Sequence, residues 1–351
     1  MSVSLSGPGF FRFVLALLVF LNHTTRVDVG FAAVLIFFTL SGYWIFNMWT
    51  ERYARARDPY VTFVVSRMWR LFPAFLLCSA IAWPLAFWNG NIPARTTWIY
   101  QIVPNLLILG YSLDWQPNVP AWSLDIEVQF YLIAPLLIAA AARSTIGTLI
   151  ACVACSAAAV ALGAGWFVAY YIVFFAIGMA AAKAEWRPSP RLAWGALAVT
   201  SAVVLLWMIS PLRSALVDSD RYVAPRGYRD MADLVFALMV IPWTIYTASQ
   251  RATRIDRALG DLSYLLYLFH EPLYQTLNFA VESHLGRVLM KLGILTVILL
   301  VSLIVWVGVD RPSNRARSRW VSNRVRLGSR HSGALLGDET RAAVDPVLNE
   351  R

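Results

Sequence analysis

The sequence predicts an all-α fold: a polytopic membrane helix bundle of about ten transmembrane helices with both termini in the cytoplasm. Of its 351 residues, 59% are hydrophobic and only 14% are charged, whereas about a quarter are charged in an ordinary soluble domain. The apolar residues gather in runs long enough to cross the roughly 30 Å hydrocarbon core of a bilayer. Lys and Arg outnumber Asp and Glu by 30 to 20, and most of them flank these runs on one side. These observations exclude a simple soluble enzyme.

Ten stretches approach the length of a membrane span, about 20 apolar residues. They are 10–27, 29–49, 71–88, 121–142, 145–164, 166–183, 192–211, 231–249, 260–281 and 288–309. The stretch 98–113 is shorter and contains Pro104, so we expect a re-entrant or interfacial segment there. The first stretch has no basic leader region and no small-residue cleavage site after it, so it is not predicted to be a cleaved signal.

Basic residues give the predicted orientation. With the N-terminus inside, 21 of the 30 Lys and Arg residues fall in cytoplasmic segments and eight fall outside, which the positive-inside rule favours. Residues 311–330 carry seven Arg and no acid. We therefore expect a transmembrane domain over 1–310 and a basic, disordered cytoplasmic tail over 311–351 that lies on the anionic leaflet of the plasma membrane. The tail has too few aromatic residues to indicate nucleic-acid binding.

Ionisable residues inside apolar spans are costly, so they mark candidate functional sites. The first span carries Arg12 and His23, which are three helical turns apart and therefore lie on one face, about 16 Å apart along the axis. The fourth span opens with Asp125 and Glu127, and two carboxylates there need partners. Tyr131 lies one turn after Glu127 on the same face.

The ninth span carries a polar stripe. Ser263, Tyr267 and His270 are separated by steps of four and three residues, which match the helical repeat and place them on one face. Such a stripe facing a bundle interior favours a binding cavity. In the second span, Ser41 and Gly42 are small and allow another helix to approach closely.

Arg67 and Arg70 are three residues apart just before the third span. Such a pair can bind phosphates through planar guanidinium groups, although its spacing alone favours anchoring at the cytoplasmic membrane edge. We find no Walker loop, serine-nucleophile elbow or metal-ligand spacing, so we expect no metal and no permanently bound cofactor. The remaining chemistry is a His base or nucleophile beside carboxylates, which fits transfer from a phosphate-bearing donor to a hydroxyl.

Six motifs, in order and over most of the chain, resemble those of the integral-membrane acyltransferase-three family of O-antigen, exopolysaccharide and Nod-factor acetyltransferases. They are Arg12-x10-His23, Phe37-Phe38-x-Leu40-Ser41-Gly42, Arg67-x2-Arg70-x2-Pro73, Trp122-Ser-Leu-x2-Glu127-x-Gln129-Phe-Tyr131, Ser263-Tyr-x2-Tyr267-x2-His270-x-Pro272 and Asp310-Arg311-Pro312. There is one departure: the family often has an acid where this sequence has Leu35, and Asp28 is a nearby acid that could replace it.

The resemblance implies acyl-CoA, usually acetyl-CoA, as co-substrate and a glycan or lipid-linked glycan hydroxyl as acceptor. It implies His23 as general base or acyl-His intermediate, with Arg12 as a second catalytic residue and Glu127 as the acid that orients His23 or stabilises its charged form. The expected donor and acceptor contacts are Arg67, Arg70, Ser41, Asp125, Tyr131, Ser263, Tyr267 and His270. Two alternatives remain: a proton-coupled transporter or flippase, and a non-catalytic partner of a polysaccharide synthase. The oligomeric state is not predicted.

Overall fold

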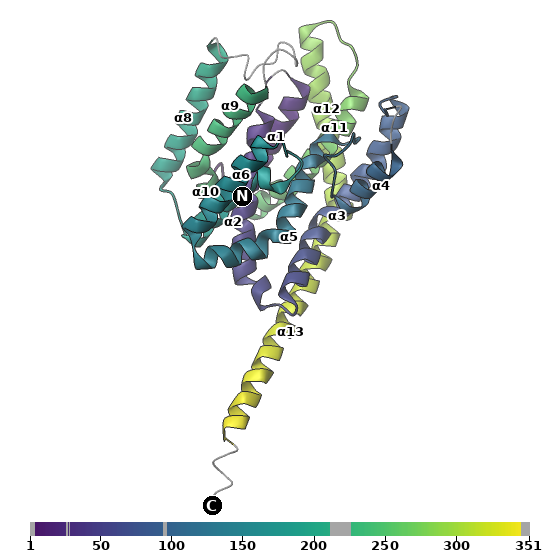
Figure 1. The fold of residues 1–351 in the computed structure, drawn as a ribbon. Coiled ribbons are helices and arrows are strands. Elements are labelled where there is room, and N and C mark those ends of the chain that lie inside the picture. Colours follow the sequence, from purple (N-terminus) through teal and green to yellow (C-terminus); the bar gives the residue numbers. More distant parts are fainter. Residues whose placement is uncertain (1–3, 26, 28, 94–96, 211–225, 345–351) are drawn as a thin grey trace, which may run out of the picture.

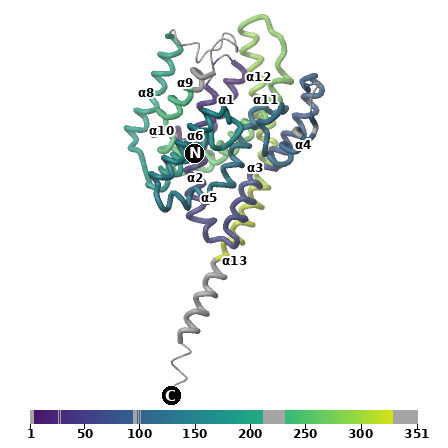
Figure 2. Tube along the Cα trace, in the orientation of Figure 1, coloured from purple at the N-terminus to yellow at the C-terminus, as the bar shows by residue number. Residues whose placement is uncertain are grey.

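The computed structural model describes residues 4–25, 27, 29–93, 97–210 and 226–344, and over these residues it is helical throughout, without a β-strand (Figure 1). The α-helices are α1 (Pro8–Thr24), α2 (Gly30–Glu51), α3 (Pro59–Trp88), α4 (Trp98–Leu107), α5 (Trp122–Arg143), α6 (Thr145–Ala161), α7 (Ile172–Lys183), α8 (Pro190–Ile209), α9 (Arg226–Met239), α10 (Ile241–Ala248), α11 (Arg254–Leu277), α12 (His284–Val305) and α13 (Arg311–Val344). The 3-10 turns η1 (Tyr53–Arg55), η2 (Val119–Ala121) and η3 (Val168–Tyr170), and the π-helical turn η5 (Trp306–Asp310), join them. The bundle is therefore all-α, as predicted, and Figure 2 follows its chain path.

Helix starts follow from local sequence. Pro8, Pro59 and Pro190 begin α1, α3 and α8, where the missing N–H of proline costs nothing because that donor has no helical partner. Ser144 and Thr253 cap α6 and α11 by accepting a backbone N–H with their hydroxyl groups. Such caps satisfy donors that a helix leaves free at its first turn.

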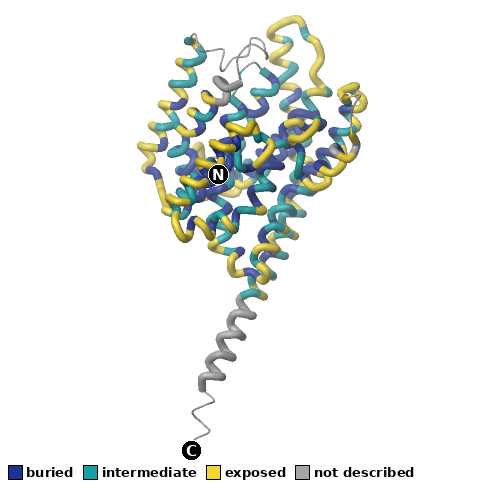
Figure 3. The backbone as a smooth tube through the Cα atoms, in the orientation of Figure 1, coloured by how far each residue is buried: buried dark blue, intermediate teal, exposed yellow. Residues whose placement is uncertain are grey.

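The centre of the bundle is formed by α1, α2, α5, α7 and α11, where the buried residues gather (Figure 3). Helix α2 packs along α7 with direct backbone contact. A Cβ added to Gly42 would lie 2.0 Å from the carbonyl oxygen of Phe175, and one added to Gly178 would lie 2.0 Å from that of Thr39. The prediction that the small residues of the second span permit close helix approach is therefore confirmed for Gly42.

Helices α1 and α11 run parallel and in contact at both ends. Near their starts, the Asp256 carboxylate accepts hydrogen bonds of 2.9 Å from the backbone N–H groups of Gly9 and Phe10. Near their ends, His23 contacts His270. Gly9 and His23 have the same sequence separation as Asp256 and His270, so one register holds along the whole helix pair.

Five described helices are long and apolar enough to cross a membrane, and the number rises to six if α9 and α10, bent by 49°, form one span. The predicted number of ten and the predicted sides of the termini stay predictions. Residues 98–107 form a ten-residue helix, α4, in agreement with a segment too short to span. Helix α8 has 11% of its apolar window buried, against 61% for α2, and its outward residues Leu205 and Ile209 are exposed. Outward apolar faces of this kind suit lipid contact.

Residues 311–344 form helix α13, which continues through η5 from α12 and packs against α3. The expectation of a disordered tail is therefore wrong for residues 311–328, which pack against the bundle. Arg324 forms an ion pair of 2.8 Å with Asp58, and Val321 is 1% exposed. A Cβ on Gly328 would lie 2.4 Å from the carbonyl oxygen of Arg55. The polar composition of this segment suggests disorder when it is considered alone. Its partners, such as Asp58 and Arg55, lie far away in the sequence, so their contacts could not be foreseen.

Candidate functional site

A cavity of about 580 Å³ opens between α1, α2, α3, α5, α11 and α13. Its volume falls in the range of small-molecule binding sites, about 300–1,000 Å³. It brings together seven predicted site residues that come from five different helices: Arg12, Ser41, Arg67, Arg70, Glu127, Ser263 and Tyr267. The sequence motifs therefore converge on one site in three dimensions.

Glu127 of α5 forms hydrogen bonds with Ser41 of α2 and with Tyr131, which also contacts Arg67. Its Oε1 accepts from the Ser41 hydroxyl at 3.0 Å and from the Tyr131 hydroxyl at 2.5 Å. Arg67 in turn donates from Nη2 to the Tyr131 hydroxyl at 3.4 Å and lies over the Tyr131 ring. Tyr131 itself is 0% exposed, so it holds Glu127 and Arg67 at the cavity wall from behind.

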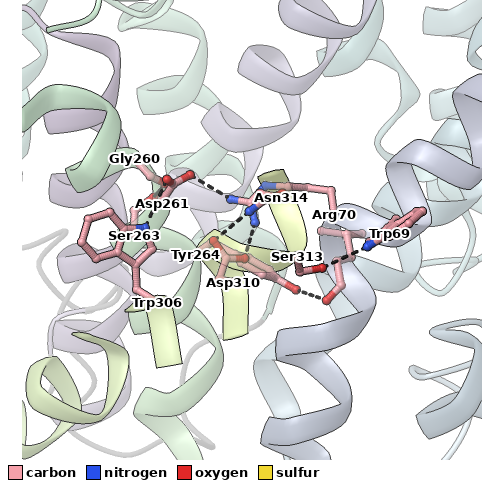
Figure 4. A network of polar contacts seen from close by, with 11 residues as sticks. Trp69, Arg70, Gly260, Asp261, Ser263, Tyr264, Trp306, Asp310, Ser313 and Asn314 are labelled. Carbon is pink, nitrogen blue, oxygen red and sulfur yellow. Dashed lines mark hydrogen bonds and ion pairs between the residues drawn. The ribbon is translucent and has the colours of Figure 1, made fainter. Parts of the chain in front are cut away.

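Arg70 has a different environment from Arg67. Its guanidinium donates to Asp310 at 2.8 Å and to Asp261 at 3.4 Å, and it stacks over the Tyr264 ring (Figure 4). Asp310 lies in the π-helical turn η5 and also accepts from Asn314. Two carboxylates thus neutralise Arg70 and connect α3 to α11 and to η5. The two members of the predicted arginine pair therefore differ: Arg70 forms ion pairs, whereas Arg67 forms none with the described residues.

Arg12 lines the same cavity from α1, and its guanidinium lies 5.4 Å from the centre of the Trp44 ring. The close contact of Gly9 with Gly260 fixes this part of α1, because a Cβ on Gly260 would lie 3.3 Å from the Gly9 Cα. A guanidinium over an aromatic ring remains able to donate in its own plane. Arg12 can therefore contact an anion in the cavity.

His23 lies near the far end of α1, beside two residues of α11. Its Nδ1 is 3.2 Å from Oε2 of Glu271, and its ring centre is 5.0 Å from that of His270. His270 is 0% exposed; its Nδ1 lies 2.8 Å from the carbonyl oxygen of Tyr267, and its Nε2 has no hydrogen-bond partner among the described residues. The three side chains offer ligand atoms within 4.8 Å of one another, a set that could also hold a metal ion. Sequence spacing alone indicated no such cluster.

Tyr267 contacts both the cavity and the histidine cluster. It lines the cavity, and its ring centre is 5.9 Å from that of His270. Its hydroxyl donates to the carbonyl oxygen of Pro120 at 2.8 Å and lies 2.6 Å from the Ser123 hydroxyl. Both partners precede or begin α5, so Tyr267 joins α11 to the start of that helix.

Asp125 lies outside the cavity lining. It is 0% exposed, and its carboxylate accepts from the backbone N–H of Tyr111 at 2.8 Å and from Gln129 at 2.9 Å. These bonds hold the chain segment that precedes α5. Of the two acids in the fourth span, Glu127 lines the cavity, whereas Asp125 stabilises the loop before α5.

The structure does not place Glu127 beside His23. Glu127 bonds to Ser41 and Tyr131, while Glu271 occupies the position next to His23. Asp28, the other acid considered there, lies outside the described residues. The sequence offered one signal for Glu271, an acid directly after His270 in an apolar span, but not its partner.

Comparison with known proteins identifies the family. The model of an acyltransferase domain, that of the acyltransferase-three family, matches residues 6–309. The chain belongs to the acyltransferase-three family. No solved structure matches it significantly.

Three relatives of this acyltransferase carry descriptive names. A protein of Komagataeibacter xylinus named as the membrane-bound transacylase BcsY is 26% identical over 344 residues, covering 91% of this chain and 84% of that protein. The acyltransferase MdmB of Streptomyces mycarofaciens is 34% identical over 33% of this chain and 30% of its own length. The O-acetyltransferase OatA of Staphylococcus aureus is 31% identical over 36% of this chain and 23% of its own length. Membership and the apolar helices together indicate a multi-pass membrane acyltransferase.

Proposed function

We propose that the chain is an O-acyltransferase of the plasma membrane. It moves an acyl group, most simply acetyl, from cytosolic acyl-CoA to a hydroxyl of a cell-surface or exported glycan. Support comes from the family, from its resemblance to an O-acetyltransferase and a transacylase, and from the arrangement of the site.

One observation supports this proposal most strongly. Tyr267 lines the cavity together with several arginines, and its ring contacts His270. His270 in turn contacts His23, which pairs with Glu271. A donor with its phosphates among the arginines points its acyl end toward the histidines. An acceptor hydroxyl then approaches His23 from the opposite membrane face.

His23 acts as the general base in this reaction. As the acceptor oxygen attacks the thioester carbonyl, His23 takes the hydroxyl proton, and Glu271 stabilises the imidazolium that forms. The tetrahedral intermediate collapses with cleavage of the carbon–sulfur bond, and the leaving thiolate takes the proton from His23. The products are an ester and free CoA. In the acyl-His variant, His23 first attacks the thioester itself and then passes the acyl group to the acceptor.

Arg12, Arg67 and Ser41 bind the donor in this proposal, and Glu127 and Tyr131 keep Arg67 and Ser41 in place. Ser263, Tyr267 and His270 line the route between the donor and His23. Asp125 and Arg70 support the site without contacting substrate, because their charged groups are bonded to protein partners.

The ester content of surface glycans tests the proposal. We expect a deletion strain to lose an O-acyl group that returns with the wild-type gene and with His284→Ala, a change at an exposed histidine, but not with His23→Ala. An unchanged glycan in the deletion strain would favour a transporter or an assembly partner. Full ester content with His23→Ala would refute the role of His23.

A further inference from the structure

Helix α13 contributes to the cavity described above although the family match ends at residue 309. Arg317 is its contribution, and it lines the cavity together with Arg52 and Arg67. The helix is held in a defined position, because Trp69 donates to Ser313 at 3.0 Å and Arg57 donates its backbone N–H to the carbonyl oxygen of Arg324 at 2.9 Å. Arg317 is therefore presented by a packed helix.

The guanidinium of Arg317 has few protein partners. Its Nη1 is 3.4 Å from the Ser66 hydroxyl, and its Nε is buried without a hydrogen-bond partner in the part of the chain that the structure describes. Arg67 also has a buried Nε without a partner. Neither arginine forms an ion pair within the described part of the chain. Both arginines are partly buried. A cation that is partly removed from water without a counter-ion is costly, so an anion bound in the cavity would relieve this cost.

The other charges at the cavity narrow the position of that anion. Arg70 is already paired with Asp261 and Asp310. Among the described residues, Arg52 donates to neutral groups, the carbonyl oxygen of Ser318 at 3.2 Å and the Ser322 hydroxyl at 2.9 Å. The lining acids are Glu51, Glu127 and Asp261. Arg52 directly after α2, Arg67 in α3 and Arg317 in α13 thus line the cavity without forming an ion pair within the described residues.

We propose that Arg317, with Arg67 and Arg52, forms a phosphate-binding cluster that takes the phosphate groups of the acyl donor. This inference rests on the proposed function in one respect, that the donor is a phosphorylated nucleotide thioester. Planar guanidinium groups bind phosphate oxygens in pairs, and three of them from three elements match a ligand with more than one phosphate. Helix α13 thereby becomes part of the donor site.

Binding of unacylated CoA to the purified full-length protein tests the proposal. We expect Arg317→Gln to weaken CoA binding roughly tenfold to hundredfold, and Arg317→Lys, which keeps the charge but loses the planar group, to weaken it less. Arg319→Gln is the matched control, because Arg319 is an exposed arginine on the same helix. We expect this control to bind CoA as the wild type does. Thermal melting checks that each variant is folded.

The outcomes separate this inference from the proposed function. Equal CoA binding by wild type and a folded Arg317→Gln variant overturns the phosphate cluster and leaves the acyl-CoA donor intact. If wild type does not bind CoA but inorganic pyrophosphate raises its melting temperature only when Arg317 is present, the cluster stands and CoA as donor fails. If neither CoA nor pyrophosphate binds, the cluster is wrong. If the effect of Arg317 appears only with phosphatidylglycerol vesicles and not with phosphatidylcholine vesicles, the site is for lipid and the proposal is wrong.

Discussion

His23 and Glu271 form the pair on which the proposed chemistry depends, and they come from opposite ends of the sequence. An imidazole whose Nδ1–H is held by a carboxylate presents its other nitrogen as a base. His270 stands next to them with a free Nε2. The same three side chains could instead bind a metal ion, and the two possibilities differ in what a chelator does.

Prolonged dialysis against EDTA distinguishes them. If His23 acts as a base without a metal, acyl transfer by the purified protein stays within about twofold of the untreated rate, because no step depends on a Lewis acid. A loss of activity that Zn²⁺ restores would contradict the proposed base and assign the three residues to a metal site.

Asp125 and Glu127 test how the two acids of α5 divide their roles. We expect Asp125→Ala to lower stability by about 1–3 kcal/mol, because it leaves the buried N–H of Tyr111 without an acceptor. Glu127 faces the cavity, where water can take the place of its carboxylate. We therefore expect Glu127→Ala to cause a smaller loss of stability and a larger loss of activity than Asp125→Ala. Thermal melting in detergent and acyl transfer in membranes measure the two effects. The structure would be contradicted if Glu127→Ala lowered stability more than Asp125→Ala, and Asp125→Ala lowered activity more than Glu127→Ala.

Sequence reasoning found the residues of this site that carry visible polarity inside apolar spans, such as Arg12, Glu127 and Tyr267. It could not find the pairings. Glu271 and Glu127 look equivalent in the sequence, and only the parallel register of α1 and α11 brings Glu271 to His23. Arg317 was hidden in a basic segment whose composition resembles an unfolded tail.

At the scale of elements, the contact of α2 with α7 positions the cavity wall. Gly42 meets the backbone of Phe175 directly, while its neighbour Ser41 faces the cavity and donates to Glu127. The close approach at one residue therefore fixes the hydrogen bond at the next. The sequence motif combines a packing residue and a site residue.

Enlarging Gly42 tests this coupling. We expect Gly42→Ala to destabilise the protein by about 1–3 kcal/mol, because the added Cβ overlaps a backbone carbonyl that cannot move freely. Gly195→Ala in α8 is the control, since a Cβ there meets nothing within 4 Å. Thermal melting compares the variants. Equal melting of the two variants would show that α2 and α7 do not touch as described.

At the scale of the whole molecule, the all-helical fold and the membrane character could be predicted from composition and run length alone. Helix boundaries and the number of spans could not. The apolar run 231–249 contains a bend of 49° between α9 and α10, and the first apolar run ends as a helix at Thr24. A long run of apolar residues is expected both in a helix surrounded by lipid and in a helix buried in the protein core. The length of the run therefore does not distinguish a core helix from a membrane span.

Membrane orientation is a prediction at this scale. We expect green fluorescent protein fused after Arg351 to fluoresce, and alkaline phosphatase inserted within 211–225 to be active, because basic residues favour a cytoplasmic C-terminus. The opposite orientation would be indicated if the fluorescent protein after Arg351 stayed dark and alkaline phosphatase fused at that C-terminal position were active. The arginine-lined cavity would then face away from cytosolic acyl-CoA.

Transfer of labelled acetyl from acetyl-CoA in isolated membranes tests the central claim most directly. With His23→Gln, we predict that CoA still binds with wild-type affinity, because His23 does not line the cavity. We predict that ester formation on membrane glycan falls by roughly 10²–10⁴-fold, the contribution of a general base. Undiminished ester formation by His23→Gln would contradict the account.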